Sequence, residues 1–387
     1  MIEPSELLAI LKAHGVSSIL SLPCSSFAGL LQAVDDDSAI EHLRMTSEAE
    51  GVGIAAGCWL SGKAPAILIQ NSGFADAINP ICSLLDTFRI PVPFFISVRG
   101  GFGIADEPQH DILGGRFETI VRALGLPYFV LPNEAAAAAG VLSQIFTDYI
   151  AKRQSVIIAV PMGTFAARSA PAAEPAPAHD PHPSRTDVLQ AIRAGAPTDA
   201  IFVCSTGFIG RDLFLLGDRP SNIYVAGSMG CASAIGYAIS RSCERTVIVL
   251  DGDGAALMRL GNLATLGNQQ CGRLVHIILN NGVYESTGGQ ANFARNVNFV
   301  EVARACGYSP LSRRLTDCEA MVTALTEIGS GLARAQPVLI DMITARCSAK
   351  PSARPDISYP DQASRLRDSL TPGDRSHQAT NAMEACQ

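Results

Sequence analysis

Short apolar runs recur along the chain, and most of them end in glycine or polar residues. In the first half the runs are SSILSLP, PAILIQNSG, PFFISVRG, PYFVLP and SVIIAVP. In the second half they are AIFVCSTG, NIYVAGSMG, TVIVLDGDG, LVHIILNNG and PVLIDMITA. Such runs, separated by helical segments such as SEAEGVGIAAGCWLSG and GRFETIVRALG, are typical of parallel strands covered on both faces. The pattern predicts an α/β fold with two parallel sheets, each flanked by helices.

The two groups of runs are separated by the stretch SAPAAEPAPAHDPHP, which is rich in alanine and proline and has no periodicity. This composition predicts an extended linker. We therefore expect a first domain over residues 1–168, a linker over 169–184, a second domain over 185–360 and a C-terminal tail over 361–387. No middle domain is expected between the halves.

Ligands of parallel sheets bind at the carboxyl ends of the strands, so the polar residues after each run are candidates for a site. Asp253 stands between Gly252 and Gly254 after one run, and Asn281 follows the next run 28 positions later. Carboxylate, amide and backbone carbonyl oxygens, completed by phosphate oxygens, are ligands that Mg²⁺ prefers. The pair predicts a magnesium-diphosphate site, although an isolated Asp253 could equally cap a helix.

A GDG sequence followed about 25 residues later by NN resembles the motif of thiamine diphosphate enzymes. The resemblance implies that Asp253, Asn281 and the carbonyl of Val283 hold Mg²⁺, which in turn holds the cofactor diphosphate. The segment GSMG resembles the one whose large apolar residue keeps the cofactor bent, a role that would fall to Met229; taken alone, Met229 would be an ordinary core residue. The residues predicted to bind the cofactor are Asn71, Ser205, Thr206, Gly227, Ser228, Met229, Gly252 and Gly254.

Thiamine diphosphate enzymes also need a carboxylate that contacts N1′ of the aminopyrimidine. The stretch TSEAEGVGIAAGCWLSGK carries two glutamates, Glu48 and Glu50. Family members place the glutamate nine residues before the glycine of an A-x-G pattern, which is Gly57 here and selects Glu48. Glu50 is then an ordinary acidic residue of the first helical turn, where its negative charge interacts favourably with the helix dipole. Both glutamates could have only this structural role.

Long stretches resemble phosphonopyruvate decarboxylases over almost the whole chain, with sulfopyruvate decarboxylases next. They include QNSGFADAINPICSL, ADEPQHD, GRDLFLLGDRP, AGSMGCASAIG and LDGDGAALMRLGNLATLG. The resemblance implies a carboxy-lyase that uses thiamine diphosphate and Mg²⁺ to convert 3-phosphonopyruvate into phosphonoacetaldehyde and CO₂. The stretches SLPCS and EAEGVGIAAG look more like the sulfopyruvate enzyme. The substrate could therefore also be sulfopyruvate, which would give sulfoacetaldehyde, or another 2-oxo acid.

A small, multiply charged 2-oxo acid needs local hydrogen-bond donors and positive charge. Arginine suits bidentate contact with oxyanions, and histidine can donate a proton near neutral pH. His110 is a candidate catalytic residue, although a histidine in a surface loop is the simpler interpretation. The candidate substrate-binding residues are Ser25, Ser72, Arg99, Glu285 and Gln290.

Charge and cysteine content narrow the classes of partner and compartment. The formal net charge is −7 and no basic block occurs, so nucleic acid is not expected as a partner. No apolar stretch approaches the roughly 18 residues that a membrane helix needs. The 11 cysteines form no C-x-x-C pair, which favours free thiols in a reducing cytoplasm.

The resemblance implies a homodimer or larger homo-oligomer with active sites between subunits. Two other classes compete with an active decarboxylase. One is a cofactor-binding scaffold that no longer catalyses. The other is a nicotinamide dehydrogenase, which is disfavoured because the G-x-G-x-x-G fingerprint is missing.

Overall fold

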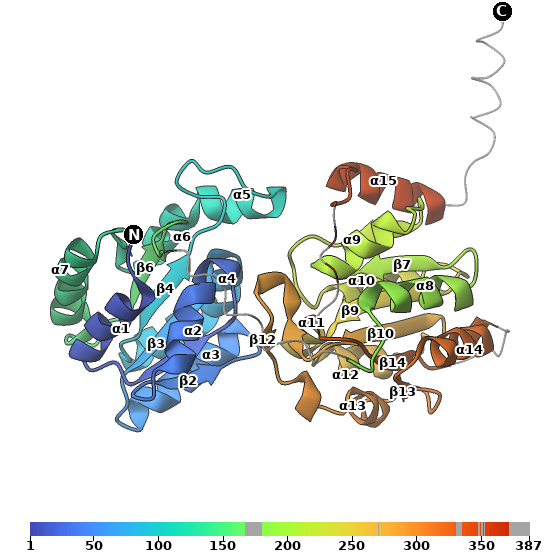
Figure 1. Ribbon diagram of the computed structural model, residues 1–387, viewed down its shortest axis with the longest axis horizontal. Helices are drawn as coiled ribbons and strands as arrows, with labels where there is room; N and C mark the ends of the chain where they lie inside the picture. The colour runs from blue at the N-terminus through green and yellow to red at the C-terminus, as the bar shows by residue number, and fades with distance from the viewer. Residues whose placement is uncertain are drawn as a thin grey trace, which may run out of the picture. The chain divides into compact units, whose positions relative to one another are not determined.

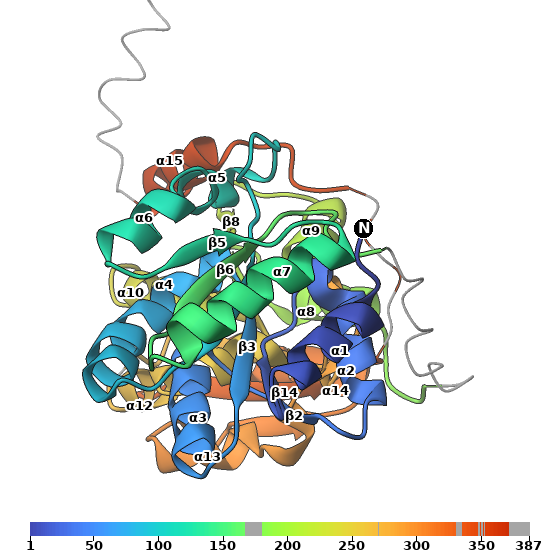
Figure 2. The ribbon, with the colours of Figure 1, turned by 90° about the vertical axis from the view of Figure 1, so that its left-hand side faces the viewer.

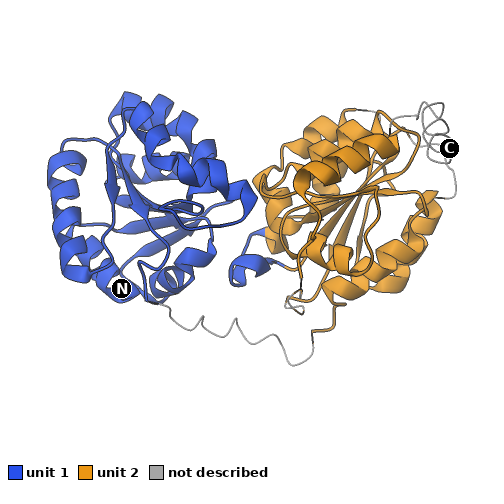
Figure 3. Ribbon diagram, turned by 90° about the horizontal axis from the view of Figure 1, so that it is seen from above, with its two compact units in different colours: residues 1–179, 282–293 blue, residues 180–281, 294–387 orange. Residues whose placement is uncertain are grey.

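The computed structural model describes residues 1–166, 180–269, 271–329, 335–346, 349, 351 and 353–370. They form two compact units, which are coloured separately in Figure 3. Unit 1 comprises Met1–His179 and Gly282–Phe293, and unit 2 comprises Asp180–Asn281 and Ala294–Gln387. Figure 1 labels the helices and strands of both units.

Unit 1 contains a six-stranded sheet in which every strand runs parallel to its neighbours. Its strands are β1 (Ser18–Ser21), β2 (Glu41–Arg44), β3 (Pro65–Gln70), β4 (Pro93–Ser97), β5 (Tyr128–Val130) and β6 (Val156–Val160). They lie side by side in the order β2-β1-β3-β4-β6-β5. The four inner strands are almost completely buried, which explains why their sequences are apolar without alternation.

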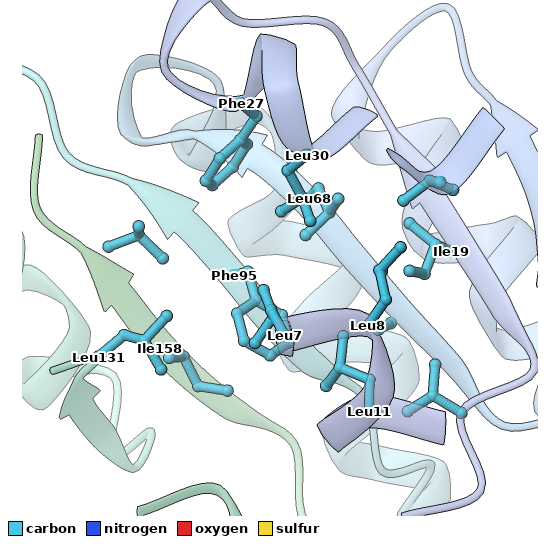
Figure 4. Close-up of a cluster of buried hydrophobic side chains, with 14 of the residues drawn as sticks. Leu7, Leu8, Leu11, Ile19, Phe27, Leu30, Leu68, Phe95, Leu131 and Ile158 are labelled. Atoms are coloured by element: carbon cyan, nitrogen blue, oxygen red, sulfur yellow. The ribbon is translucent and has the colours of Figure 1, made fainter. Parts of the chain in front are cut away.

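Helices cover both faces of this sheet. On one face, apolar side chains of three helices pack against Leu68 and Phe95 of the sheet. Figure 2 shows the ribbons of these helices over the sheet, and Figure 4 shows part of the buried cluster. The neighbouring Ile67 and Ile69 are also buried and, because side chains alternate along a strand, point to the opposite face. The helices of the first face are α1 (Pro4–Ala13), α2 (Ala28–Asp36) and α7 (Ala135–Ile145). The other helical segments before residue 166 are η1 (Ser25–Phe27), α3 (Glu48–Leu60), α4 (Asn71–Pro80), η2 (Ile81–Asp86), α5 (Pro108–Gly115), α6 (Phe117–Ala123) and η3 (Phe146–Ile150).

Unit 2 contains a second six-stranded sheet, again with all neighbours parallel. Its strands are β7 (Ile201–Cys204), β8 (Asn222–Tyr224), β9 (Val247–Gly252), β10 (Leu274–Asn280), β13 (Arg313–Leu315) and β14 (Val338–Ile343). Their order across the sheet is β13-β14-β10-β9-β7-β8.

Two apolar clusters, one on each face, hold the helices of unit 2 against this sheet. The helices of the first cluster are α8 (Arg185–Gly195), α9 (Phe208–Leu215) and α14 (Cys318–Gly329). Those of the second are α10 (Ala232–Ser240), α11 (Asp253–Met258), α12 (Asn262–Gly267), α13 (Phe299–Ala305) and α15 (Tyr359–Leu370), with the short turn η5 (Ala294–Asn296) beside them.

Counted along the chain, the six strands of each unit lie in the same order, second-first-third-fourth-sixth-fifth. In both sheets the second strand lies on one side of the first strand, and the third strand lies on its other side. The carboxyl ends of the first and third strands therefore border the switch point at which such sheets bind ligands. These strands are β1 and β3 in unit 1, and β7 and β9 in unit 2.

The predicted fold class, two parallel sheets flanked by helices, is confirmed. The sequence patterns missed β2 and β13, which are edge strands with the polar sequences EHLR and RRL. Neither is fully buried, so no apolar run marks them.

The compact units differ from the predicted domains in two places. Segment 282–293, inside the predicted second domain, is grouped with unit 1. It forms the antiparallel pair β11 (Val283–Tyr284) and β12 (Gln290–Ala291), with η4 (Glu285–Thr287) between them, and belongs to neither large sheet.

Helix α15 crosses the predicted boundary at residue 360, because Leu366 packs into the second apolar cluster of unit 2. Residues 169–179 of the predicted linker and 371–387 of the predicted tail lie outside the described residues.

Candidate active site

Glu48 is a buried carboxylate at the start of a helix that follows an edge strand of unit 1. Glu48 is the first residue of α3 and is only 5% exposed. Gly73, in the first turn of α4, faces it. A Cβ atom at position 73 would lie 1.6 Å from Oε1 of Glu48. Only glycine at position 73 leaves room for this carboxylate where it is.

Glu50 lies two residues further along and has a different environment. Its exposed side chain accepts hydrogen bonds from the backbone N–H (2.7 Å) and the hydroxyl (2.6 Å) of Thr46. Its own N–H donates to the hydroxyl of Ser47 at 3.4 Å. Ser47 therefore caps the N-terminus of α3, and Glu50 ties the preceding Thr46 to the first turn. The geometry favours Glu48 as the functional carboxylate and Glu50 as a structural residue at the start of the helix.

Asn71 ties together two strand ends at the carboxyl edge of unit 1. It follows β3 directly, and its amide both donates to the carbonyl of Arg99 (2.9 Å) and accepts from the N–H of Arg99 (3.0 Å). Arg99 follows β4, the neighbouring strand. The side chain predicted to bind the cofactor therefore fixes the backbone from which Arg99 projects.

Arg99 forms a bidentate ion pair with Asp106, with Nε and Nη2 each 2.5 Å from a carboxylate oxygen. The contact holds the pKa of Asp106 below its ordinary value and raises the pKa of Arg99. Asp106 was not among the predicted site residues, although it lies in the stretch ADEPQHD. It lies seven positions from Arg99 in the same loop, and only the folded loop shows that the two side chains pair.

His110 lies close to this ion pair because the loop after β4 folds back tightly. Gly100 has φ of +68°, and a Cβ atom there would lie 2.6 Å from the carbonyl oxygen of His110. Desolvation, followed by the nearby charge of Arg99, lowers the pKa of His110. Its Nδ1 is buried and has no hydrogen-bond partner among the described residues. The structure thus brings His110, Arg99 and Asp106 together.

Two candidate serines of unit 1 lie on the protein surface of the single chain. Ser25 begins η1 after β1 and is exposed. Ser72 is also exposed, and its hydroxyl accepts a hydrogen bond from the amide of Gln70 at 2.8 Å. Both follow the strands that border the switch point of unit 1.

The two remaining substrate candidates lie on segment 282–293. Gln290 exchanges hydrogen bonds with Thr287, at 3.0 Å to its hydroxyl and 3.2 Å to its carbonyl. These contacts close the turn between β11 and β12. Glu285 is half-buried at the start of that turn.

In unit 2, Asp253 lies at the end of β9 and is 3% exposed. Its Oδ1 accepts a hydrogen bond from the N–H of Gly254 at 2.6 Å. The neighbouring strand β10 pairs with β9 so that Leu279 lies opposite Gly252. Asp253 and Asn281 therefore follow adjacent strands at the same edge of the sheet, and Val283 comes two residues later.

The backbone loops beside Asp253 adopt conformations that favour glycine. Gly227, Ser228 and Gly230, after β8, have φ of +61°, +41° and +80°. A Cβ atom on Gly230 would lie 2.7 Å from the carbonyl oxygen of Ala255, so this loop packs closely on α11. Met229 is half-buried within the loop.

The switch point of unit 2 also carries the candidates that follow β7. Ser205 is buried, and its N–H donates to the carbonyl of Leu250 on β9 at 2.8 Å. Thr206 is half-buried, and Gly207 after it has φ of +104°. These residues and Asp253 therefore follow neighbouring strands of one sheet.

A buried polar network supports the end of β10. The amide of Asn280 donates to Asp341 on β14 at 3.0 Å, and Nε of Arg314 donates to the other oxygen of Asp341 at 2.7 Å. Asp341 is fully buried. Asp341 and Arg314 were not among the predicted site residues. A charged residue inside the apolar run PVLIDMITA was the signal that could have found the first of them.

The comparisons with known proteins show the family of this chain. The N-terminal TPP binding domain of thiamine pyrophosphate enzymes matches residues 5–100, and the C-terminal TPP binding domain matches residues 217–342. The chain is 35% identical over 385 residues to a phosphonopyruvate decarboxylase of Streptomyces hygroscopicus, covering 96% of this chain and 94% of that protein. This chain belongs to the thiamine pyrophosphate-dependent decarboxylases.

Two further relatives belong to the same group of decarboxylases. A phosphonopyruvate decarboxylase of Streptomyces viridochromogenes is 33% identical over 384 residues, with 96% of each chain covered. A sulfopyruvate decarboxylase of Methanosarcina acetivorans is 30% identical over 328 residues, which cover 79% of this chain and 83% of that protein.

The residues of this decarboxylase fit its cofactor, thiamine pyrophosphate. Asp253 and Asn281 offer oxygen ligands at one sheet edge, and Gly73 keeps space for the carboxylate of Glu48. Within the described part of the chain, no group of three or more His, Cys, Asp or Glu side chains could hold a metal. A metal at Asp253 would therefore need oxygen atoms from other sources, which a diphosphate supplies.

No helix in the described ranges combines the length and the apolar character needed to cross a bilayer.

Proposed function

We propose that this decarboxylase converts 3-phosphonopyruvate into phosphonoacetaldehyde and CO₂, with thiamine diphosphate and Mg²⁺. The observation that carries the proposal is the full-length similarity to two phosphonopyruvate decarboxylases, at 35% and 33% identity over 96% of this chain. When bound, the thiamine cofactor supplies the electron sink for the loss of CO₂ from a 2-oxo acid. The protein's own residues then have four tasks.

The first task is to hold Mg²⁺ and the diphosphate, which we assign to Asp253, Asn281 and the carbonyl of Val283. The side chains of Asp253 and Asn281 are hard oxygen ligands on adjacent strand ends. The network of Asp341 and Arg314 supports this edge, because it fixes Asn280 next to Asn281. We also assign cofactor binding to the loop Gly227–Met229 and to Ser205 and Thr206. These residues follow neighbouring strands at the same edge of the sheet of unit 2.

The second task is proton exchange at N1′ of the aminopyrimidine, which we assign to Glu48. A carboxylate that is only 5% exposed is costly to keep charged unless a partner shares its proton or its charge. Proton sharing with a ring nitrogen meets that requirement. The contact with Gly73 restricts where the carboxylate can lie.

The third task is recognition of the anionic substrate, and the fourth is handling a proton near it. We assign them to the Arg99–Asp106–His110 group, with Ser25, Ser72, Glu285 and Gln290 as further candidates. The lowered pKa of His110 favours its neutral form at neutral pH, in which one ring nitrogen donates and the other accepts. The pairing with Asp106 fixes the guanidinium of Arg99 in one orientation.

We further propose a homodimer or larger homo-oligomer in the cytoplasm, with active sites between subunits. The nine cysteines in the described ranges are all free thiols, which fits a reducing compartment. An active monomer in gel filtration coupled to an activity assay would contradict the proposed assembly.

The test is a direct assay of both candidate substrates. Purified protein with thiamine diphosphate and Mg²⁺ is mixed with phosphonopyruvate or sulfopyruvate, and the aldehyde is trapped by a coupled NADH-dependent reductase. We expect a higher kcat/KM for phosphonopyruvate and loss of activity in Glu48→Gln. A preference for sulfopyruvate, whose decarboxylase is 30% identical to this chain, would keep the reaction class and overturn the substrate. No turnover of either acid by cofactor-loaded protein would overturn the proposed reaction.

A further inference from the structure

Unit 1 has a pocket of about 430 Å³ at the amino ends of its central strands, away from the edge that carries Glu48. Val16, Pro65 and Pro93 line it at the starts of β1, β3 and β4. Trp59, from the last turn of α3, and Phe146, from η3, complete its aromatic wall. The volume is within the range of small-molecule sites, roughly 300–1,000 Å³.

The wall of this pocket offers carbon atoms rather than hydrogen-bond donors. Pro65, Pro91 and Pro93 have no N–H group, so the strand starts present rings where other residues would present amides. Trp59 and Phe146 add two aromatic side chains. An apolar or aromatic ligand body fits these surroundings better than a sugar or a nucleotide phosphate.

Two cationic side chains border the pocket. Lys63 lines it, with Nζ 2.6 Å from the carboxylate of Glu41, and both side chains are close to half exposed. The guanidinium of Arg153 lies 4.8 Å from the centre of the Trp59 ring. It donates to the carbonyls of Arg89 (3.0 Å) and Phe88 (3.4 Å) and keeps further N–H groups. Glu41 balances the charge of Lys63, so the net positive charge here comes from Arg153, which contacts the lining residue Trp59 and favours a ligand with an acidic group.

The backbone is strained at the same corner. Four non-glycine residues in the described ranges have positive φ, and two of them are Arg89 (+53°) and Arg153 (+64°). Both follow helical turns, at positions where glycine is the usual residue. The other two, Phe102 and Ser228, lie in the candidate active-site loops. Strained residues gather at functional sites, and here the side chain of one strained arginine bonds the backbone of the other.

The helical turns beside the pocket are also irregular. Both η2, which ends three residues before Arg89, and η3, which carries Phe146 and Ile150, are π-helical. Short π-helical turns are frequent at functional sites. Pocket, charge, strain and helix irregularity thus coincide in one place that the proposed decarboxylation does not use.

We propose that this pocket is a second ligand site, for a small aromatic anion such as an aromatic carboxylate or sulfonate. The ring contacts Trp59 and Phe146, and the acidic group lies at Lys63 and Arg153. The site is separate from the proposed decarboxylation site, since its residues lie at the amino ends of the strands, whereas Glu48 lies at the carboxyl ends.

The test uses the fact that Trp59 is the only tryptophan of the chain. Full-length protein loaded with thiamine diphosphate and Mg²⁺ is titrated with 8-anilinonaphthalene-1-sulfonate while tryptophan emission is recorded. We expect saturable quenching of Trp59 with matching energy transfer to the probe. Absence of saturable quenching up to millimolar probe would overturn the proposal.

Three variants decide whether the quenching reports this pocket. Ala64→Phe fills it and is expected to remove the saturable quenching, with circular dichroism confirming the fold. Lys63→Met should weaken probe binding about three- to tenfold. Lys12→Met is the matched control, since Lys12 is paired with Asp37 at 2.5 Å and does not line the pocket.

Two results would contradict the site. If folded Ala64→Phe quenches like the wild type, the probe binds elsewhere. If Lys63→Met and Lys12→Met bind the probe equally well, the site does not select anions, and the proposed ligand class is wrong.

Discussion

The two units share one strand order but place different chemistry at equivalent strand ends. The third strand of each sheet runs directly into a helix, and the first helical residue is Asn71 in unit 1 and Asp253 in unit 2. Asn71 uses both ends of its amide on the backbone of Arg99. Asp253 places a buried carboxylate at the same point. The same position thus holds a structural tie in unit 1 and, in unit 2, the carboxylate that we propose as a metal ligand.

The second strand shows the same division. In unit 1 it leads into α3, whose first residue is the buried Glu48. In unit 2 it leads into a loop with left-handed residues at 227, 228 and 230 before α10 begins. Unit 1 therefore carries the groups suited to proton transfer, whereas unit 2 carries backbone turns and oxygen ligands suited to a diphosphate. Four changes test this comparison.

Replacing the proton-handling carboxylate of unit 1 should have the largest effect. Glu48→Gln cannot exchange a proton, so we expect kcat for decarboxylation to fall by roughly 10²–10⁴-fold. Glu50→Gln is the matched control, because an amide oxygen can still accept from Thr46. Steady-state kinetics of both variants would check this, and equal losses would refute the assignment of Glu48.

The metal site is predicted to depend on unit 2. Titration calorimetry with thiamine diphosphate present should show that Asp253→Asn binds Mg²⁺ more weakly than the wild type. Loss of a residue that only hydrogen-bonds to a metal ligand typically costs roughly 10- to 100-fold in affinity, and we expect a larger loss here. Asp187→Asn, in the exposed first turn of α8, serves as the control. Unchanged Mg²⁺ affinity in Asp253→Asn would remove the metal role from this residue.

The close contact between α3 and α4 offers a finer test of Glu48. In Gly73→Ala the new methyl group would occupy the place of Oε1, so the carboxylate must move. A displacement of about 1 Å at a reacting group can cost about 10²-fold in rate. Gly53→Ala is the control, since a Cβ atom there meets nothing within 4 Å.

The control should also stabilise the fold, because alanine in an exposed helix is favoured over glycine by about 0.5–1 kcal/mol. Denaturant unfolding would measure that gain. Wild-type activity in Gly73→Ala would show that the position of Glu48 is not restricted in this way.

The smallest expected effect is a change in the titration of His110. Removing the positive charge in Arg99→Gln should raise the pKa of His110, because Arg99 disfavours the imidazolium. In the wild type the pKa of His110 is lower in the folded protein than in the unfolded chain, so the unfolded chain binds a proton at His110 first as the pH falls. The contribution of His110 to the stability of the fold therefore decreases as the pH drops below about 6.5. That fall should be weaker in Arg99→Gln.

Histidine-selective NMR, with His110→Gln used for assignment, would measure this titration in both proteins. An unchanged pKa in Arg99→Gln would separate His110 from the ion pair of Arg99 and Asp106.

The sequence by itself determined the fold class and the cofactor. Buried parallel strands must be apolar on both faces, so the inner strands appear as continuous runs and could be recognised one by one. The strands β2 and β13 could not, because edge strands with few buried residues carry no such signal. The GDG and NN motifs led to the proposed metal ligands Asp253 and Asn281, because oxygen ligands at adjacent strand ends suit Mg²⁺.

Only the tertiary structure decided what surrounds each candidate. The spacing to Gly57 favoured Glu48 over Glu50 in the sequence, but only the structure shows the burial of Glu48 against Gly73 and the contact of Glu50 with Thr46. The pairing of Arg99 with Asp106 depends on how the loop after β4 folds, and the Asp341 network depends on strands that are distant along the chain. Periodicity and spacing report local geometry, whereas burial and charge pairing arise only once the sheets are assembled.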